Sequence, residues 1–256
     1  MRFNATKCYI MSLARKKKSS FFYSLDNTIL QSVSNNPYLG VQFSENLTWT
    51  HHINSISKKA NSTLGFLKRN LRHCPAVSRR TAYIALVRPL LEYGAIIWDP
   101  HLKQDITKLE HTQRAAVRFI ARDYRTTTPG FVTDLLNRHD LPTLQERRET
   151  LRLTFFYKVV EGLVTAIPPE SFLKKPRSTR LRRPKFSSQN FVVQNPVNTY
   201  MRNNDRFYEI PKANTEQYKN SYFPRTIEAW NKLDSNIVLS KTIDSFKSSL
   251  AVAKPR

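Results

Sequence analysis

Acidic residues are scarce in this sequence, and none occurs between Glu45 and Glu92. The 256 residues include 42 Lys and Arg against 19 Asp and Glu, which gives a formal charge of +23. Two-metal phosphoryl transfer needs carboxylates that converge on magnesium, yet the sequence has no Asp-Asp pair and no Asp-x-Asp. We therefore predict no catalytic residue, no metal site and no cofactor in this chain.

Glycine and cysteine are also rare. The sequence has 5 glycines and contains neither a Walker loop, nor a Gly-x-Ser-x-Gly elbow, nor a metallopeptidase motif. Cys8 and Cys74 lie far apart without a Cys or His at ligand spacing, so neither a disulfide framework nor a zinc site is indicated. We interpret the 6 histidines as surface or capping residues: His51, His52, His73, His101, His111 and His139.

Long apolar runs are missing as well. No stretch approaches the length of a membrane-spanning helix, and the first residues, "MRFNATKCYIMSLARKKK", have no signal-peptide pattern. We therefore expect an intracellular protein, nuclear or cytoplasmic, without a membrane partner. With 40% hydrophobic residues the chain can bury a real core, and its excess of positive charge favours RNA, DNA or an RNA–DNA hybrid as its partner. The sequence does not indicate an oligomeric state.

The first 50 residues have the composition of β-strands. "KCYIMSLA" and "FFYSLDNTILQSV" are rich in Tyr, Phe, Ile and Val, and Asp26-Asn27 is a turn dipeptide. Tyr38 to Phe43 predicts one further strand. A hairpin plus one strand is too little sheet for a domain, so we expect it either to pack on the helices that follow or to have lost neighbours that once completed it.

Helical periodicity dominates the centre of the chain. From Thr50 to about His73, apolar residues recur at steps of three and four and predict a helix ended by Pro75: Ile53, Ile56, Ala60, Leu64, Leu67 and Leu71. Ser78 can cap a second helix, which Pro89 should kink or break. Residues 102–121 and 132–139 predict two more helices.

The remaining helices carry clear end signals. Thr143 and Glu146 form a capping box before a helix with Leu151, Phe155 and Val159 on one side. Two final helices should bury, respectively, Ile227, Trp230 and Leu233, and Ile243, Phe246 and Leu250. The predicted fold is mainly α: a helical bundle after a small N-terminal β element. The predicted regions are strands in 1–50, the bundle in 51–167, a basic, partly disordered linker in 168–215 and a helical segment in 216–256.

Two basic regions are candidates for phosphate contact. The acid-free region contributes Lys58, Lys59, Lys68, Arg69, Arg72, Arg79, Arg80 and Arg88. A solvated helix face usually mixes both signs of charge, so we favour phosphate contact here. Nearby aromatic residues, Trp49, Tyr83, Tyr93 and Trp98, could stack on bases, although aromatic residues at helical spacing are more often part of a core. The linker adds Lys174, Lys175, Arg177, Arg180, Arg182, Arg183 and Lys185.

An ordered series of segments carries a family resemblance. "MRFNATKCYIM", "YLGVQFSENLTWTHHI", "ANSTLGFLKRNL", "AYIALVRPLLEYGAIIWDP", "KLEHTQRAAVRFI" and "SYFPRTIEAWNKL" follow one another along nearly the whole chain. In this order they closely resemble the C-terminal part of reverse transcriptases from non-LTR retrotransposons of the jockey and related LINE type. The resemblance implies the end of the palm, then the thumb and post-thumb helices.

The resemblance also implies specific roles. Tyr38, Leu39, Gly40 and Val41 correspond to the primer-grip region, and the catalytic Tyr-x-Asp-Asp motif, with its Mg²⁺, belongs just upstream of "MRFNATKC". We therefore expect a fragment of an RNA-directed DNA polymerase that keeps only template and primer binding. The alternative is a non-enzymatic nucleic-acid-binding or interaction protein retained by its host.

Overall fold

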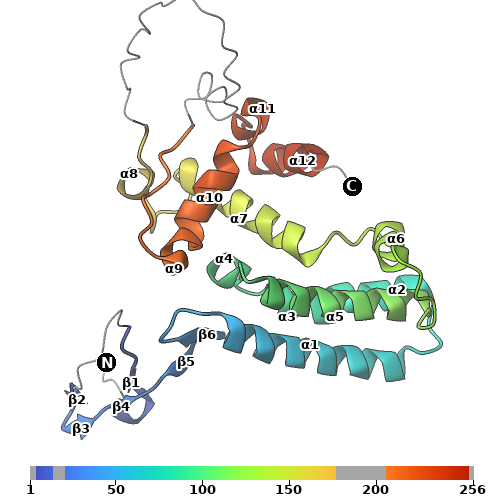
Figure 1. Ribbon diagram of the computed structural model, residues 1–256, viewed down its shortest axis with the longest axis horizontal. Helices are drawn as coiled ribbons and strands as arrows, with labels where there is room; N and C mark the ends of the chain where they lie inside the picture. Colours follow the sequence, from blue (N-terminus) through green and yellow to red (C-terminus); the bar gives the residue numbers. More distant parts are fainter. Residues whose placement is uncertain (1–3, 14–20, 177–205, 254–256) are drawn as a thin grey trace, which may run out of the picture. The chain divides into compact units, whose positions relative to one another are not determined.

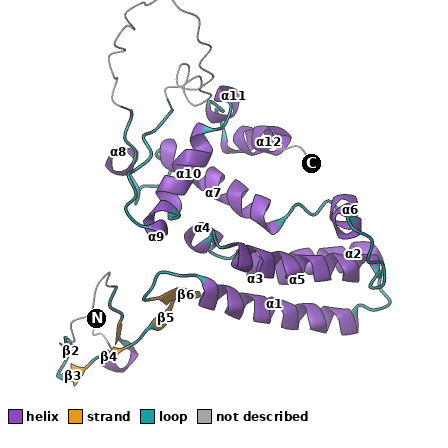
Figure 2. Ribbon diagram, viewed as in Figure 1, coloured by secondary structure: helices purple, strands orange, loops and turns teal. Residues whose placement is uncertain are grey.

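The computed structural model describes residues 4–13, 21–176 and 206–253 and is mainly helical (Figure 1). Strands are short and lie near the N-terminus, as Figure 2 shows. This confirms the predicted fold class. The chain forms two compact units, Met1–Glu149 and Thr150–Arg256. Their division falls within helix α7 (Leu144–Val160), inside the region 51–167 that we predicted as one bundle.

The described strands form three separate pairs rather than one sheet. A short 3-10 helix, η1 (Ala5–Lys7), comes first; β1 (Tyr9–Ile10) is parallel to β4 (Gln31–Ser32), and β2 (Ser24–Leu25) is antiparallel to β3 (Thr28–Ile29). Asp26 and Asn27 connect β2 and β3 with φ of 47° and 59°. Positive φ at both turn residues suits a tight hairpin, so the predicted turn is confirmed.

The third pair corrects the prediction of a single strand from Tyr38 to Phe43. β5 (Asn35–Tyr38) and β6 (Val41–Ser44) are antiparallel, and Tyr38 pairs with Val41. Between them, Leu39 and Gly40 have φ of 47° and 84°. The chain therefore reverses at Leu39-Gly40, because two successive residues with positive φ make a two-residue hairpin turn.

This turn packs against a second turn of the same unit. The Tyr93 hydroxyl donates a hydrogen bond to the Leu39 carbonyl at 3.1 Å. A Cβ on Gly40 would lie 3.1 Å from Cε1 of Tyr93, so only glycine fits here without displacing that ring. Val41, one residue on, is buried. The hairpin is thus attached to the helices at its turn, as expected for so small a sheet.

Most helices of the first unit lie close to their predicted places. They are α1 (Thr50–Asn70), α2 (Ala76–Ala82), the π-helical segment η2 (Tyr83–Val87), α3 (Arg88–Glu92), α4 (Ala95–Trp98), α5 (Lys103–Ala121) and α6 (Phe131–Arg138). Pro89 lies in the first turn of α3, directly after the π-helical segment, but the helix runs on from Ala76 to Glu92, so the chain does not break at Pro89 as predicted. Ser78 is not a cap: α2 begins at Ala76 after Pro75, whose side chain makes no capping bond.

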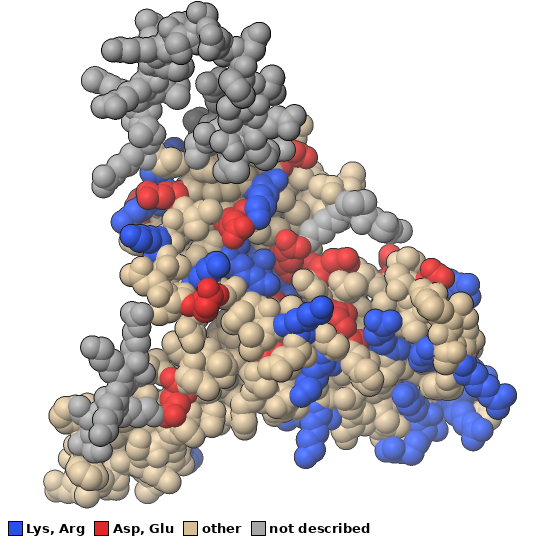
Figure 3. Space-filling view, in the orientation of Figure 1, with Lys and Arg blue, Asp and Glu red and all other residues tan. Residues whose placement is uncertain are grey.

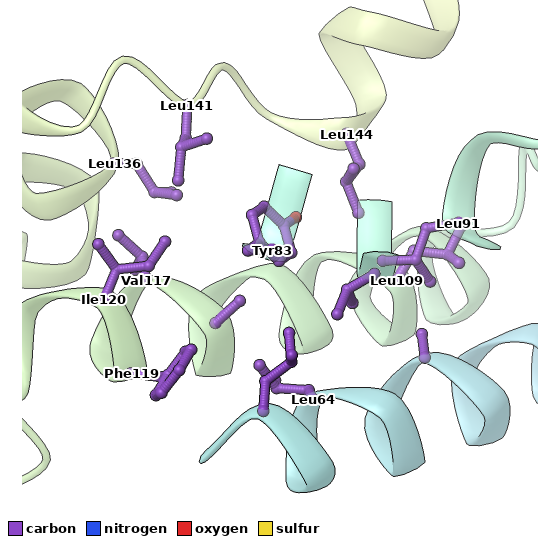
Figure 4. Packing of buried hydrophobic residues seen from close by; sticks show 14 of the residues in the cluster. Leu64, Tyr83, Leu91, Leu109, Val117, Phe119, Ile120, Leu136, Leu141 and Leu144 are labelled. Atoms are coloured by element: carbon purple, nitrogen blue, oxygen red, sulfur yellow. The ribbon is translucent and has the colours of Figure 1, made fainter. Parts of the chain in front are cut away.

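The core of the first unit joins α1 to α5 and α6 (Figure 4). On α1, Ile53, Ala60, Leu64 and Leu67 are buried, and Ile56 and Leu71 pack against them, as the periodicity predicts. Helix α5 contributes Leu109, Val117 and Ile120. Each fully buried side chain of this size contributes about 1.5 to 3 kcal/mol to folding. α1 is therefore a rigidly held helix with one face free of the core.

A buried histidine ties the hairpin to the start of α1. His52 is 2% exposed, and its Nδ1 accepts a hydrogen bond from the Gln42 backbone N–H at 3.2 Å. Its ring meets that of Trp98 edge-on, with centroids 5.1 Å apart. We had interpreted His52 as a surface or capping residue; it is instead a core residue that must be neutral to accept this bond. Burial, with Lys59 and His51 nearby, lowers the pKa of His52 to about 4.

We expect this histidine to make the fold sensitive to acid. The unfolded chain takes up a proton near pH 6.5 and the folded chain only near pH 4, so stability falls as pH drops through that window. The loss should approach about 2 to 3 kcal/mol. His52→Asn can still accept from Gln42 but cannot be protonated, so its urea midpoint should fall less between pH 7 and pH 4.5. The exposed control His51→Asn should behave as the parent; equal acid sensitivity in all three would contradict the assignment.

The second unit contains the end of α7 and five further described helices: α8 (Pro169–Phe172), α9 (Glu216–Lys219), α10 (Tyr222–Asn231), α11 (Ser235–Val238) and α12 (Ile243–Ala253). The capping box of α7 is confirmed: the Thr143 N–H donates to Glu146 Oε2 and the Glu146 N–H to Thr143 Oγ1, both at 3.1 Å. Ile227, Trp230, Phe246 and Leu250 are buried, and Leu233 and Ile243 pack against them, as predicted.

The predicted apolar side of α7 is wrong in part. Leu151 is 37% exposed and Phe155 only partly buried, whereas the core holds Phe156, Tyr157 and Leu153 besides Val159. Two overlapping sets of apolar residues on α7 fit helical spacing, and aromatic packing decides which set is buried. The ring centroids of Phe156 and Trp230 are 5.0 Å apart, and those of Tyr157 and Phe246 are 4.7 Å apart.

The described ends of the region 168–215 pack into the second unit. Leu173 and Tyr208 are both buried, and the Glu209 N–H donates to the Lys174 carbonyl at 2.7 Å. This part of the predicted linker is therefore ordered structure. Throughout the described ranges, no helix combines the length and the apolar character that crossing a membrane requires.

Candidate nucleic-acid interface

The predicted phosphate contacts of α1 lie mainly on one exposed side of this helix. Lys58, Lys59 and Arg69 are exposed along α1, and Arg72 is exposed in the turn after it rather than on the helix itself. Lys58 and Arg69 are about three turns apart, which places them on the same side and roughly 16 Å apart along the axis. Figure 3 shows Lys and Arg gathered over this part of the molecule. We call Lys58, Lys59, Arg69 and Arg72 the α1 cation set.

Lys68 differs from the other predicted residues. Its side chain is half-buried, and Nζ lies 5.7 Å from the ring centroid of Tyr124. Burial lowers the pKa of the Lys68 ammonium. A cation above an aromatic face gains electrostatic attraction, so this lysine is partly engaged by its own chain. Lys68 is therefore less available for phosphate than the exposed cations of α1.

Two arginines of the acid-free region have structural partners. Arg79 is buried; its Nη2 and Nε donate to the Ile120 carbonyl at 2.6 and 3.0 Å, and its Nη1 donates to the Cys74 carbonyl. Arg80 Nε donates to the His139 carbonyl at 2.6 Å. Carbonyls at helix ends lack partners within their own helix, and these guanidinium groups supply them. Arg79 is therefore not free for phosphate, contrary to the prediction, whereas the Arg80 side chain is only partly engaged and stays 34% exposed.

Three carboxylates of the same unit are engaged by groups of that unit. Glu92 pairs with Arg147 and Asp99 with Arg148. Glu110 accepts from the Gln145 and Leu144 N–H groups at the start of α7, at 2.8 and 3.3 Å, and burial raises its pKa.

The α1 cation set, by contrast, has no ion pair within the part of the chain that the structure describes. Helix α1 contains no Asp or Glu, so its exposed side carries only positive charge.

The primer-grip-like segment and the aromatic candidates for base stacking each contain both exposed and buried residues. Of the primer-grip-like segment, Tyr38 and Leu39 are 65% and 74% exposed, Gly40 is exposed in the turn, and Val41 belongs to the core. Of the aromatic candidates for base stacking, Tyr83 and Trp98 are fully buried and Trp49 packs on Phe43, whereas Tyr93 is exposed beside the hairpin turn.

Of the cations predicted to bind phosphate in the linker, the structure describes only the first two. Lys174 and Lys175 are exposed shortly after α8. The other predicted residues, Arg177, Arg180, Arg182, Arg183 and Lys185, lie outside the described residues. The structure therefore locates the two lysines on the surface of the second unit and does not test the rest of this prediction.

A polar groove between α1 and α5 was missed by the sequence analysis. Its volume is about 540 Å³, and it is lined by Asn54, Ser57, Lys58, Asn61, Gln104, Thr107, Lys108 and His111. Both helices contribute residues at steps of three and four, so the same periodicity that reveals apolar faces could have revealed this polar one. Because the sequence analysis considered only cations as phosphate contacts, it identified only Lys58 among these lining residues.

The described residues contain no group of three or more His, Cys, Asp or Glu side chains arranged to hold a metal ion. Comparison with protein-family models, with curated proteins and with solved structures finds no match to this chain. The interface is therefore interpreted from its own residues: a rigid helix with several unpaired cations on one side, a polar groove beside it and an exposed hairpin turn in the same unit.

Proposed function

We propose that this chain binds nucleic acid through the α1 cation set. The observation that carries the proposal is the charge of α1: the helix has no Asp or Glu, and the α1 cation set has no ion pair among the described residues, while Glu92, Asp99 and Glu110 are engaged elsewhere in the unit. Phosphates held at fixed spacing by a rigid helix would favour a duplex or hybrid over a flexible strand.

The resemblance described above supports a more specific proposal. We infer that the chain is the part of a non-LTR retrotransposon reverse transcriptase that follows the catalytic palm, acting inside the cell on RNA, DNA or an RNA–DNA hybrid. In this proposal α1 acts as a thumb helix, the exposed Tyr38-Leu39 turn meets the primer, and Lys174 and Lys175 begin a second, less shape-selective contact. Polymerisation, with its Mg²⁺, is assigned to the palm and not to these residues.

A salt titration tests the binding proposal. The variant Lys58→Ala/Lys59→Ala/Arg69→Ala removes three cations, and each lost phosphate contact should lower the slope of log K against log salt by roughly 0.7 to 0.9. Affinity for an RNA–DNA hybrid near 0.1 M salt should fall by about 100-fold. Binding is measured by fluorescence anisotropy on hybrid, duplex DNA and single-stranded RNA, and the preference for hybrid should also shrink.

A matched control separates this surface from net charge. Lys219→Ala/Lys232→Ala/Lys247→Ala removes the same number of cations, but each of these exposed lysines pairs with a carboxylate in the second unit. Its affinity should stay close to that of the parent. If both variants lost affinity equally, the effect would come from overall charge and not from the α1 cation set. If alanine at Lys174, Lys175 and the other linker cations alone changed the substrate preference, the alternative of a host-retained nucleic-acid-binding protein would be the better account.

A further inference from the structure

The loop between α5 and α6 contains three consecutive threonines, and their surroundings differ. Asp123 Oδ1 accepts hydrogen bonds from the backbone N–H groups of Arg125 and Thr126, at 3.1 and 3.0 Å. Its Oδ2 accepts from the Thr126 hydroxyl at 2.7 Å. The hydroxyl of Thr126 is therefore engaged and its side chain half-buried, whereas Thr127 and Thr128 are exposed.

Thr128 differs from Thr127 in the residue that follows it. Of the 14 prolines in the sequence, only Pro129 comes directly after a serine or threonine. Proline has a fixed φ and no backbone N–H, and proline-directed protein kinases select it directly after the hydroxyl that they phosphorylate. Arg125 lies three residues before Thr128 and is exposed, so the loop also carries a charge of the kind that kinases use to distinguish their substrates.

The backbone around Thr128 is accessible. Residues 122–130 belong to no helix or strand, and the Thr128 carbonyl accepts from the Phe131 N–H at 3.2 Å, just before α6. A Cβ on Gly130 would meet no atom within 4 Å, so the space beside Pro129 is open. A kinase has to place its catalytic groups around the acceptor hydroxyl, and an exposed loop in open surroundings permits this.

The same loop adjoins the α1 cation set. The ring of Tyr124 lies 5.7 Å from Nζ of Lys68, which directly precedes Arg69. Figure 1 shows that α1 ends at the same end of the first unit at which α5 leads into this loop. A phosphate carries a charge of about −1.5 to −2 at neutral pH. On Thr128 it would oppose the phosphates of a nucleic acid bound at Arg69, and salt would weaken this repulsion.

We propose that Thr128 is a phosphorylation site for a proline-directed protein kinase, and that its phosphate lowers the affinity of the α1 cation set for nucleic acid. The kinase transfers the γ-phosphoryl group of ATP. A bond forms between the γ-phosphorus and Thr128 Oγ1, the bond from that phosphorus to the β–γ bridging oxygen breaks, ADP leaves, and the hydroxyl proton passes to a carboxylate of the kinase. The modification is independent of the proposed function, whereas its effect on binding rests on that function.

The modification is tested on the full chain with a purified proline-directed serine/threonine kinase and Mg-ATP. Mass spectrometry of peptides locates the phosphate, which we expect on Thr128 in the parent. Pro129→Ala keeps the hydroxyl but removes the proline that the kinase selects, so its phosphorylation should fall to the level of Thr128→Ala, which has no acceptor. Thr127→Ala is the matched control; it changes an exposed neighbour and should be modified on Thr128 as the parent is.

The effect on binding is measured by fluorescence anisotropy with an RNA–DNA hybrid. Phosphorylation of the parent should lower affinity by about fivefold near 0.1 M salt, and by less at higher salt. Thr128→Ala treated with the kinase should bind as the untreated parent does.

Three outcomes overturn this inference and leave the proposed function intact: no phosphate on Thr128, equal phosphorylation of Pro129→Ala, or equal affinity with and without the phosphate. If the untreated chain binds no nucleic acid, the proposed function fails and the regulatory effect fails with it. Phosphorylation of Thr128 is then decided by mass spectrometry alone.

Discussion

Replacing Leu67 by Asp is expected to unfold the first unit. Leu67 is 3% exposed and lies in the core cluster with Leu64 and Ile53. The substitution buries a carboxylate without a designed partner, at a cost of several kcal/mol. Domains of this size have only about 5 to 15 kcal/mol of stability in total. The loss should appear as a fall in helical circular dichroism at 25 °C and as a much lower urea midpoint.

The control for this substitution is Ser62→Asp. Ser62 is exposed on the same helix, so the change should alter stability by no more than about 0.5 kcal/mol. Lys68→Asp, which the sequence would suggest as a surface control, should have an intermediate effect because Lys68 is half-buried over Tyr124. If Leu67→Asp and Ser62→Asp lose helical signal equally, the buried face of α1 has been assigned wrongly.

Replacing Arg148 by Met should have the second-largest effect on stability. Arg148 is 1% exposed and its Nε lies 3.0 Å from Oδ1 of Asp99, which is itself buried. Removing the guanidinium takes one counter-charge away from the buried Asp99 carboxylate. Breaking a buried pair in this way costs about 3 to 5 kcal/mol. Urea unfolding at pH 7 measures the loss.

The double variant Asp99→Asn/Arg148→Met identifies the cause. Asn keeps an oxygen at the position of the carboxylate but removes the charge, so the double variant should recover most of the stability that Arg148→Met loses. Recovery is plausible because the Arg148 Nη1 and Nη2 atoms, although buried, have no hydrogen-bond partner within the described residues. A double variant as unstable as the single one would show that packing of the arginine, rather than its charge, supports this site.

Helices were predicted best from the sequence where several local signals, such as apolar periodicity and capping residues, indicate the same element. The stripe of α1 and the capping box of Thr143 and Glu146 each combine several local signals, and both are confirmed. The prediction failed at Tyr38 to Phe43, where a short run allows either one strand or a hairpin. The hairpin forms because the turn at Leu39-Gly40 can rest against Tyr93, a contact that involves residues far along the chain.

The candidate interface was predictable only in part. Lys58, Lys59 and Arg69 are found by their charge, and exposure of all three agrees with the helical periodicity. The same reasoning grouped Arg79 and Arg80 with them. The sequence cannot distinguish an arginine that donates to helix-end carbonyls from one that faces solvent. The α1–α5 groove depends on two helices lying side by side, which no single segment specifies.

By itself, the sequence determined the helical class, the apolar face of α1, the end signals of the long helices and the excess of positive charge. Local propensity and periodicity act over a few residues, so these features do not depend on distant contacts. Tertiary structure alone decided which cations remain outside, which aromatic residues enter a core and which stripe of α7 is buried. Those outcomes depend on packing and hydrogen bonding between residues such as Arg79 and Ile120 or Tyr157 and Phe246, which meet only when the chain has folded.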